Sequence, residues 1–183
     1  MNKDCSRKFR GHASLRAFSF GFSLIELLIA IAILTILLSV ALPSFGQFFQ
    51  RNQLISEQQK IHSLLSYTRM AAVTQVQNVV ICRWDGESGC TGTSASNTLI
   101  WPEGALVFVD LDQDRELDEP DEKVLKIFPF SDANQISWNR GETLVYEADG
   151  SVRGGSNGTF TIENGGEVYE LVISLTGRVR RTI

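Results

Sequence analysis

The chain has 183 residues and a formal net charge of −4, which is enough length for one domain of ordinary size plus an appendage. The charge is uneven, because the first 21 residues carry +4 and the remainder carries −8. An acidic body excludes non-specific nucleic-acid binding by the whole surface, so any such contact must come from a local basic patch. His12 lies in the cationic start and His62 stands alone, so no histidine-based triad or metal cluster can form. The sequence predicts no enzyme and no cofactor.

Residues 22–42 form an apolar run in which Glu26 is the only charged residue. As a helix the run is about 31 Å long, which is enough to cross a bilayer core. The alternative is a secretory signal peptide, but its apolar region is shorter and ends at a small-residue cleavage site. Here the small residue, Gly21, precedes the run. The positive charge before it predicts a single membrane span, with residues after Leu42 in the periplasm or outside the cell.

Glu26 is a functional candidate, because a carboxylate inside an apolar span is costly unless it is paired or protonated. Cleavage after Gly21 would create an α-amino group on Phe22, one helical turn before Glu26. A neighbouring subunit could present the same group, and the pairing would favour one axial stagger between subunits. The alternative is an interfacial glutamate that extends to the headgroups, and the chemistry alone does not choose between the two.

The segment Gly21–Ala30, Gly-Phe-Ser-Leu-Ile-Glu-Leu-Leu-Ile-Ala, resembles the prepilin signature of type IV pilins and type II secretion pseudopilins. The resemblance implies that residues 1–21 are a leader, cut after Gly21 by a prepilin peptidase, with methylation of the new terminus at Phe22. It also implies an inner-membrane protein that assembles with other pilins or pseudopilins through the 22–42 helix, with Glu26 setting the register. Pro43 matches the position at which these proteins commonly place a helix-kinking proline.

Beyond this proline, apolar residues recur at spacings of three, four or seven, which predicts an amphipathic continuation of the helix over 43–77. From Asn78 the pattern changes to short segments rich in β-branched and aromatic residues, predicting an antiparallel β domain over 78–183. A hairpin turn is expected around Gly165 and Gly166. The expected strands are Val79–Trp84, Thr98–Trp101, Ala105–Asp110, Lys123–Phe128, Thr143–Glu147, Thr159–Glu163, Glu167–Leu175 and Arg178–Thr182.

Several short patterns in this half of the chain resemble the FimT/GspH group of minor pilins and pseudopilins. They are Arg69 with Ala71 and Ala72, Val79 through Cys82, Trp101 with Gly104, and Phe108 through Asp110. The resemblance implies an α+β fold in which a long N-terminal helix packs on an antiparallel β domain of two small sheets.

Cys82 and Cys90 are the cysteines that remain if the leader, with Cys5, is removed. An oxidising compartment would favour a disulfide between them that closes a short loop. The alternative is two unpaired, small hydrophobic side chains.

An acidic loop over residues 110–122 has the composition of a cation site. Its carboxylates are Asp110, Asp112, Asp114, Glu116, Asp118, Glu119, Asp121 and Glu122. Asp110, Asp112 and Asp114, with Asp121 eleven residues after the first, imitate the start and end of an EF-hand loop. However, Arg115 occupies the sixth position, where the sharp turn needs glycine, and no helices are expected to flank the loop. We therefore expect a solvated hairpin loop and no bound metal.

The C-terminal segment places Gly177, Arg178, Arg180 and Arg181 in an otherwise acidic body. In an extended chain Arg178 and Arg180 share one face about 7 Å apart, where each guanidinium can engage a phosphate. The alternative is an edge strand whose charges discourage aggregation. The Gly-Arg-x-Arg pattern resembles that of FimT-type minor pilins associated with DNA uptake, which implies sequence-independent DNA binding by Gly177, Arg178 and Arg180, with Arg181 as an additional charge.

Taken together, these features predict a non-enzymatic minor pilin of a type IV pilus that contacts DNA during natural transformation. A minor pseudopilin of a type II secretion system is the alternative. A membrane-anchored binding module that never polymerises is a third hypothesis, which requires an intact leader.

Overall fold

The computed structural model describes residues 22–91, 99–118 and 120–182, with the side chains of residues 40–44 left out. The chain divides into two compact units, Met1–Pro43 and Ser44–Ile183. The helix α1 (Leu24–Gln75) supplies the described structure of the first unit and continues into the second. Its length agrees with the predicted helix over 22–77. Among the described residues, no helix has both the length and the hydropathy of a membrane span.

Both ends of α1 have identifiable local causes. Ser23 precedes the helix and its carbonyl oxygen accepts a hydrogen bond from the Leu27 N–H at 3.1 Å, while Glu26 supplies an acidic side chain in the first turn. A carboxylate is favourable there because the helix dipole is positive at the N-terminus. At the other end, Val76 adopts a left-handed conformation with φ of 54°, and the Gln77 N–H donates back to the Ala72 carbonyl. This geometry ends the helix as glycine usually does, but with a β-branched residue.

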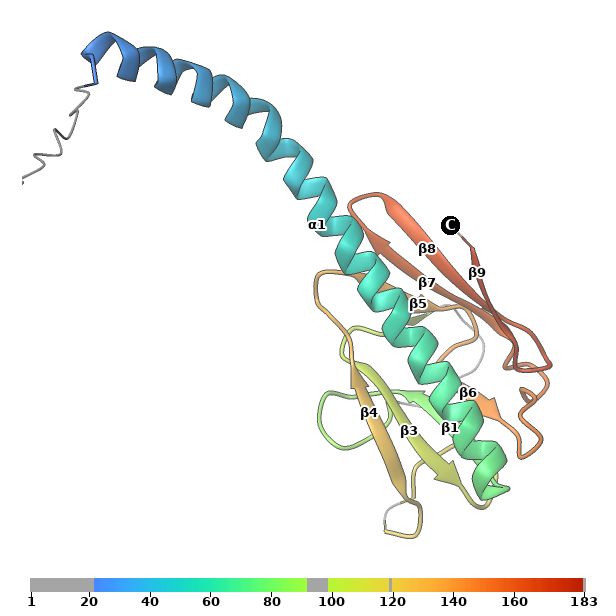
Figure 1. Ribbon diagram of the computed structural model, residues 1–183. Coiled ribbons are helices and arrows are strands. Elements are labelled where there is room, and N and C mark those ends of the chain that lie inside the picture. Colours follow the sequence, from blue (N-terminus) through green and yellow to red (C-terminus); the bar gives the residue numbers. More distant parts are fainter. Residues whose placement is uncertain (1–21, 92–98, 119, 183) are drawn as a thin grey trace, which may run out of the picture. The chain divides into compact units, whose positions relative to one another are not determined.

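The second unit contains two antiparallel sheets (Figure 1). The four-stranded sheet has the order β4 (Val124–Pro129), β3 (Gly104–Asp110), β1 (Asn78–Arg83), β6 (Thr143–Tyr146). The five-stranded sheet has the order β2 (Leu99–Ile100), β5 (Gln135–Trp138), β7 (Gly158–Asn164), β8 (Glu167–Ile173), β9 (Val179–Thr182). The predicted α+β class with two small sheets is confirmed.

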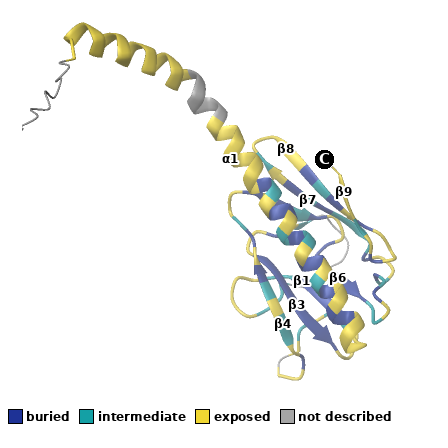
Figure 2. Cartoon of the chain, in the orientation of Figure 1, coloured by how far each residue is buried: buried dark blue, intermediate teal, exposed yellow. Residues whose placement is uncertain are grey.

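The main core lies where the second half of α1 meets both sheets. The buried stripe of the helix is dark blue in Figure 2; it includes the polar residues Glu57, Gln58 and Thr68, and its apolar members are Leu54, Ile61, Leu64, Leu65, Ala71 and Ala72. It joins one cluster with Val79 of β1 and with the aromatic group Trp101, Trp138 and Phe160. The Phe160 ring lies 4.5 Å from that of Trp138 and 5.3 Å from that of Trp101, centroid to centroid. The amphipathic pattern therefore encodes core packing from Leu54 to Ala72, whereas Phe45, Phe48 and Phe49 are exposed.

A second, smaller core covers the opposite face of the four-stranded sheet. Alternate residues of β1 and β3 face it, and its buried members are Val80, Cys82, Leu106, Phe108 and Val145. Trp84 and Cys90 from one loop and Leu117 from another pack against this cluster. Since Leu117 belongs to the acidic loop, one side of that loop is held against the sheet.

The hairpin expected at Gly165 and Gly166 is confirmed, because Asn164 pairs with Glu167 and both glycines have positive φ. Such a two-residue turn matches the twist of the strands it joins. One strand was missed: β5, whose Ile136 and Trp138 are buried while Gln135 is exposed. The expected strand Thr98–Trp101 is shorter than predicted, and Thr98 lies outside the described residues. Arg178 directly precedes β9 instead of opening it.

Candidate functional site

The first part of α1 is apolar on every side and buries none of its large side chains. Leucine and isoleucine side chains are exposed throughout residues 24–38, as the yellow segment of Figure 2 shows. Its two hydroxyls are satisfied within the helix: Thr35 Oγ1 donates to the Ala32 carbonyl at 2.8 Å and Ser39 Oγ to the Ile36 carbonyl at 2.7 Å. A helix that is hydrophobic all round needs an apolar environment supplied from outside.

Of the residues predicted to serve processing and register, Phe22 and Glu26 are described and both are exposed. Gly21, the predicted cleavage position, lies outside the described residues, as does the side chain of Pro43. Cleavage, methylation, the register role of Glu26 and the kink at Pro43 stay predictions.

Cys82 and Cys90 form a disulfide with their Cα atoms 5.7 Å apart. Cys82 lies on β1 with its side chain in the second core, and Cys90 lies opposite Trp84 in an isolated antiparallel bridge. The bond closes the loop that covers this face of the four-stranded sheet.

Gly177 has a structural reason to be glycine. It ends the turn between β8 and β9, with a φ of 70° and its N–H donating to the Ser174 carbonyl at 2.9 Å. A Cβ at this position would collide with the carbonyl oxygen of Gly150 and approach Tyr146 Cε1 to 3.1 Å. The turn therefore packs too closely against its neighbour for any side chain.

The three C-terminal arginines are exposed at the edge strand of the five-stranded sheet. The register pairs Arg180 with Val172, whose side chain is exposed, and Arg181 with Leu171, whose side chain is buried. Alternation then places Arg178 on the same outward face as Arg180, as predicted, and Arg181 on the other. Within the described part of the chain, none of the three forms an ion pair.

A fourth cation at this edge was not predicted as part of the basic group. Arg69, on α1, donates from Nη2 to the Thr176 carbonyl at 3.2 Å, directly beside the turn that precedes Arg178. We call Arg69, Arg178, Arg180 and Arg181 the arginine edge. Acids lie close by: Glu170 of β8 pairs with Thr182, on the same outward face as Arg180. Asp149 has a lowered pKa, chiefly because Ser151 hydrogen-bonds its carboxylate and to a smaller extent because Arg69 is nearby.

The acidic loop joins β3 to β4 and is a hairpin connection, as expected. It is not fully solvated, since Asp110 and Glu122 are buried. Burial raises the pKa of both carboxyls, and backbone hydrogen bonds oppose the shift only in part. Carboxylate oxygens of Asp110, Asp112 and Glu122 lie within 4.8 Å of one another. Asp121, whose spacing imitates the end of an EF-hand loop, is exposed and is not in this group.

Comparisons with known proteins agree with this architecture. Residues 57–177 match the family described as Type II transport protein GspH, and residues 17–42 match the prokaryotic N-terminal methylation motif. The crystal structure of the type IV minor pilin FimU of Pseudomonas aeruginosa PAO1 in space group P21 is similar, with 21% identity and a TM-score of 0.53, over 74% of this chain and 92% of that one. FimU in space group P65 has 20% identity and a TM-score of 0.48, over 70% and 91% of the two chains. No curated protein matches the chain significantly.

Proposed function

The chain belongs to the GspH family of pilin-like proteins, and from this premise we propose that it is a non-catalytic minor pilin of a type IV pilus. The observation that carries the proposal is the apolar part of α1, whose leucine and isoleucine side chains are exposed over residues 24–38. Burying each of them in a bilayer or against other helices is worth about 1.5–3 kcal/mol. The FimU structure with a TM-score of 0.53 is of a type IV minor pilin, which supports a pilus as the assembly, whereas the matched family is described by type II transport and keeps a secretion pseudopilus as the alternative.

In this proposal the chain is made with a leader of residues 1–21 that a prepilin peptidase removes. The 22–42 helix spans the inner membrane once and later packs among the same helices of other pilins. The domain that follows is periplasmic, where an oxidising environment suits the disulfide between Cys82 and Cys90. The matched methylation motif supports this order of events, because it covers the cleavage position and the span.

Glu26 would then pair with a methylated α-amino group on Phe22 of a neighbouring subunit. Within the part of the chain that the structure describes, no salt bridge reaches Glu26. An apolar filament interior makes an unpaired carboxylate costly, so one axial stagger between subunits is favoured.

Mass spectrometry of the membrane-extracted protein tests processing. A chain that begins at N-methylated Phe22 is the expected result. An intact leader in membranes that contain an active prepilin peptidase would contradict the pilin proposal and favour the non-polymerising module.

We assign DNA binding to the arginine edge as the finer part of this function. Arg178 and Arg180 lie on one outward face, are exposed, and have no ion-pair partner among the described residues. Exposed guanidinium groups contact phosphates without reading sequence. Arg69 adds positive charge at one end of the edge.

Titration of a fluorescent duplex with the soluble part of the chain, residues 44–183, tests this assignment. Replacing Arg178 and Arg180 with glutamine is expected to weaken binding at least tenfold and to reduce the slope of log K against log salt concentration by about 2. The matched control replaces the exposed Arg51 and Lys123 with glutamine, which removes the same charge elsewhere. Equal losses in both variants would mean that only net charge matters.

The alternative, a minor pseudopilin of a type II secretion system, keeps the same architecture, and the arginine edge would then contact other pseudopilins. Deletion of the gene separates the two functions. A loss of pili and of transformation supports the proposal, whereas a loss of protein secretion with normal pili supports the alternative.

A further inference from the structure

The acidic loop closes on itself through backbone hydrogen bonds to two buried carboxylates. Glu122 accepts from the Leu111 N–H at 2.7 Å through Oε1 and from the Asp118 N–H at 3.3 Å through Oε2. Asp110 accepts from the Gln113 N–H at 2.8 Å through Oδ1. The packing of Leu117 against the second core holds the same loop from the other side. The carboxylates are therefore held in place before any ligand arrives.

One oxygen of this loop is buried without a partner. Asp110 is 1% exposed, and its Oδ2 makes no hydrogen bond within the described part of the chain. Carboxylate oxygens of Asp112 and Glu122 lie within 4.8 Å of the Asp110 carboxylate. Burying a carboxylate oxygen without a partner is costly, and neighbouring like charges increase that cost. A bound cation would remove this cost while leaving the carboxylate charged.

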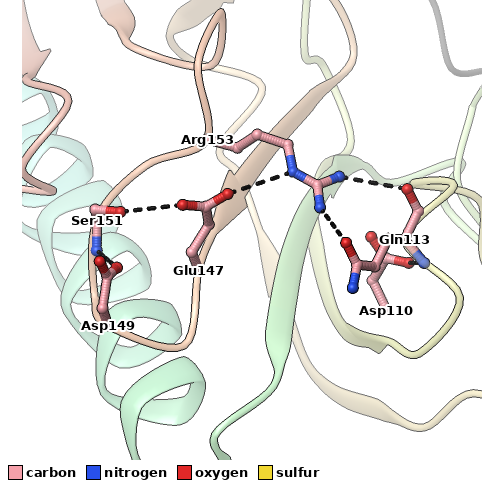
Figure 3. Close-up of polar contacts among 6 residues, drawn as sticks. All are labelled: Asp110, Gln113, Glu147, Asp149, Ser151 and Arg153. Atoms are coloured by element: carbon pink, nitrogen blue, oxygen red, sulfur yellow. Dashed lines mark hydrogen bonds and ion pairs between the residues drawn. The ribbon is translucent and has the colours of Figure 1, made fainter.

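No basic side chain of the described residues supplies that cation. Arg153 is close, but its guanidinium donates to the Gln113 side chain at 2.7 Å and to the Gln113 carbonyl at 3.3 Å, and it pairs with Glu147 at 3.6 Å (Figure 3). The positive charge of Arg153 favours the charged form of Asp110, but its guanidinium does not hydrogen-bond the Asp110 carboxylate. None of the ion pairs among the described residues includes Asp110, Asp112 or Glu122.

The sequence-based objection to a metal site was Arg115 in place of the glycine that makes the sharp turn. In the structure Arg115 makes that turn itself, with a φ of 73°, and Gln113 has a φ of 72°. The backbone therefore takes the bend that an oxygen-ligand loop requires, although the residue is not glycine.

We propose that the acidic loop binds one calcium ion, with Asp110, Asp112 and Glu122 as its carboxylate ligands. Calcium takes six to eight oxygen ligands at 2.3–2.6 Å, so two ligands of one ion are at most about 5 Å apart, which accommodates the 4.8 Å grouping. Asp114 and Asp118 form an overlapping group with Asp112. A cavity of about 190 Å³ beside Asp112 and Glu122, lined also by Leu111, Asp118 and Asp121, leaves room for coordinating water. Magnesium fits less well because it demands near-ideal octahedral geometry.

Calorimetric titration of the full chain in detergent, after dialysis against EGTA, is the first test. Calcium chloride is expected to bind with a stoichiometry of one, with a Kd of about 10⁻⁵–10⁻³ M, and to raise the Tm. Magnesium chloride is expected to bind at least tenfold more weakly. The absence of both calcium heat and a Tm shift would overturn the proposal.

Two variants separate a ligand from a general effect of charge. Asp112→Asn removes an exposed carboxylate that belongs to both groups, and it should weaken calcium binding at least tenfold. Glu116→Gln removes the same charge from the same loop but from neither group, and it should weaken binding less than threefold. Equal effects of the two variants would overturn the assignment of ligands.

Asp110→Asn distinguishes a ligand from a structural acid. The asparagine oxygen can still accept from the Gln113 N–H, while the buried charge is removed. We expect an unchanged or higher Tm in EGTA together with the loss of the calcium-induced shift. Calcium binding at the wild-type affinity in this variant would contradict the proposal.

Discussion

The two halves of α1 have the same secondary structure and opposite relations to their surroundings. Leu34 in the first half is 54% exposed, whereas Leu64 in the second half is 0% exposed. The first half finds nothing within the described residues to cover it, and the second half forms the centre of the main core. We propose that the partners of the first half are other subunits, so that assembly and folding are encoded in separate stretches of one helix.

The largest expected effect sharpens this comparison directly. Leu64→Ala should lower the free energy of unfolding of the β domain by about 2–5 kcal/mol, because it leaves a cavity in the main core. Leu34→Ala removes the same atoms from an exposed position, and it should change the free energy of unfolding of the β domain by less than about 0.5 kcal/mol. Urea denaturation followed by tryptophan fluorescence measures both. Similar losses in the two variants would show that the halves are not independent.

The disulfide gives the next largest effect, confined to the β domain. Replacing both Cys82 and Cys90 with alanine should lower the free energy of unfolding by about 2–4 kcal/mol, since it frees a loop and leaves a gap in the second core. Urea denaturation of oxidised wild type, reduced wild type and the variant measures this. If the reduced wild type were as stable as the oxidised protein, restriction of the unfolded chain by the disulfide would not contribute to stability.

Gly177→Ala separates the fold from the function of the arginine edge. The new methyl group would collide with the Gly150 carbonyl oxygen in a left-handed turn, so we expect a loss of about 1–3 kcal/mol of stability. Arg178→Gln should leave the thermal midpoint within the error of the measurement, since its side chain is exposed. Wild-type stability of the Gly177→Ala variant in thermal denaturation would show that the turn can relax.

Val76→Gly is the smallest predicted effect and tests the end of the helix. Val76 is 72% exposed and left-handed, with a φ of 54°, a conformation that a β-branched residue adopts poorly. Glycine at this position should raise the free energy of unfolding by up to about 1 kcal/mol. Thermal denaturation followed by circular dichroism measures the change, and a lower Tm would mean that α1 ends differently.

Strong periodicity made most of the fold predictable. The continuous helix, the antiparallel β domain and the Gly165-Gly166 hairpin follow from patterns that local chemistry enforces, whereas the division into two sheets was implied by the family resemblance. The strand β5 was missed because four residues between two loops carry little signal, although Ile136 and Trp138 do alternate with polar neighbours.

The candidate sites were less predictable because they depend on contacts between distant segments. Arg69 reaches the turn before Arg178 only through the packing of α1 on the β domain. Asp121 was favoured by EF-hand spacing, whereas the hairpin geometry instead brings in Glu122, the next residue, and buries it. Spacing along the chain identified the acidic loop but not which of its carboxylates converge.

The central claim is that the first half of α1 builds the subunit into a filament and that Glu26 sets its register. Quantitative immunoblotting of sheared filaments, from cells that produce equal amounts of wild-type chain or Glu26→Gln, tests it most directly. The account predicts at least a tenfold lower content of the variant in filaments, with unchanged membrane levels and unchanged stability of the β domain. Incorporation at the wild-type level would contradict it.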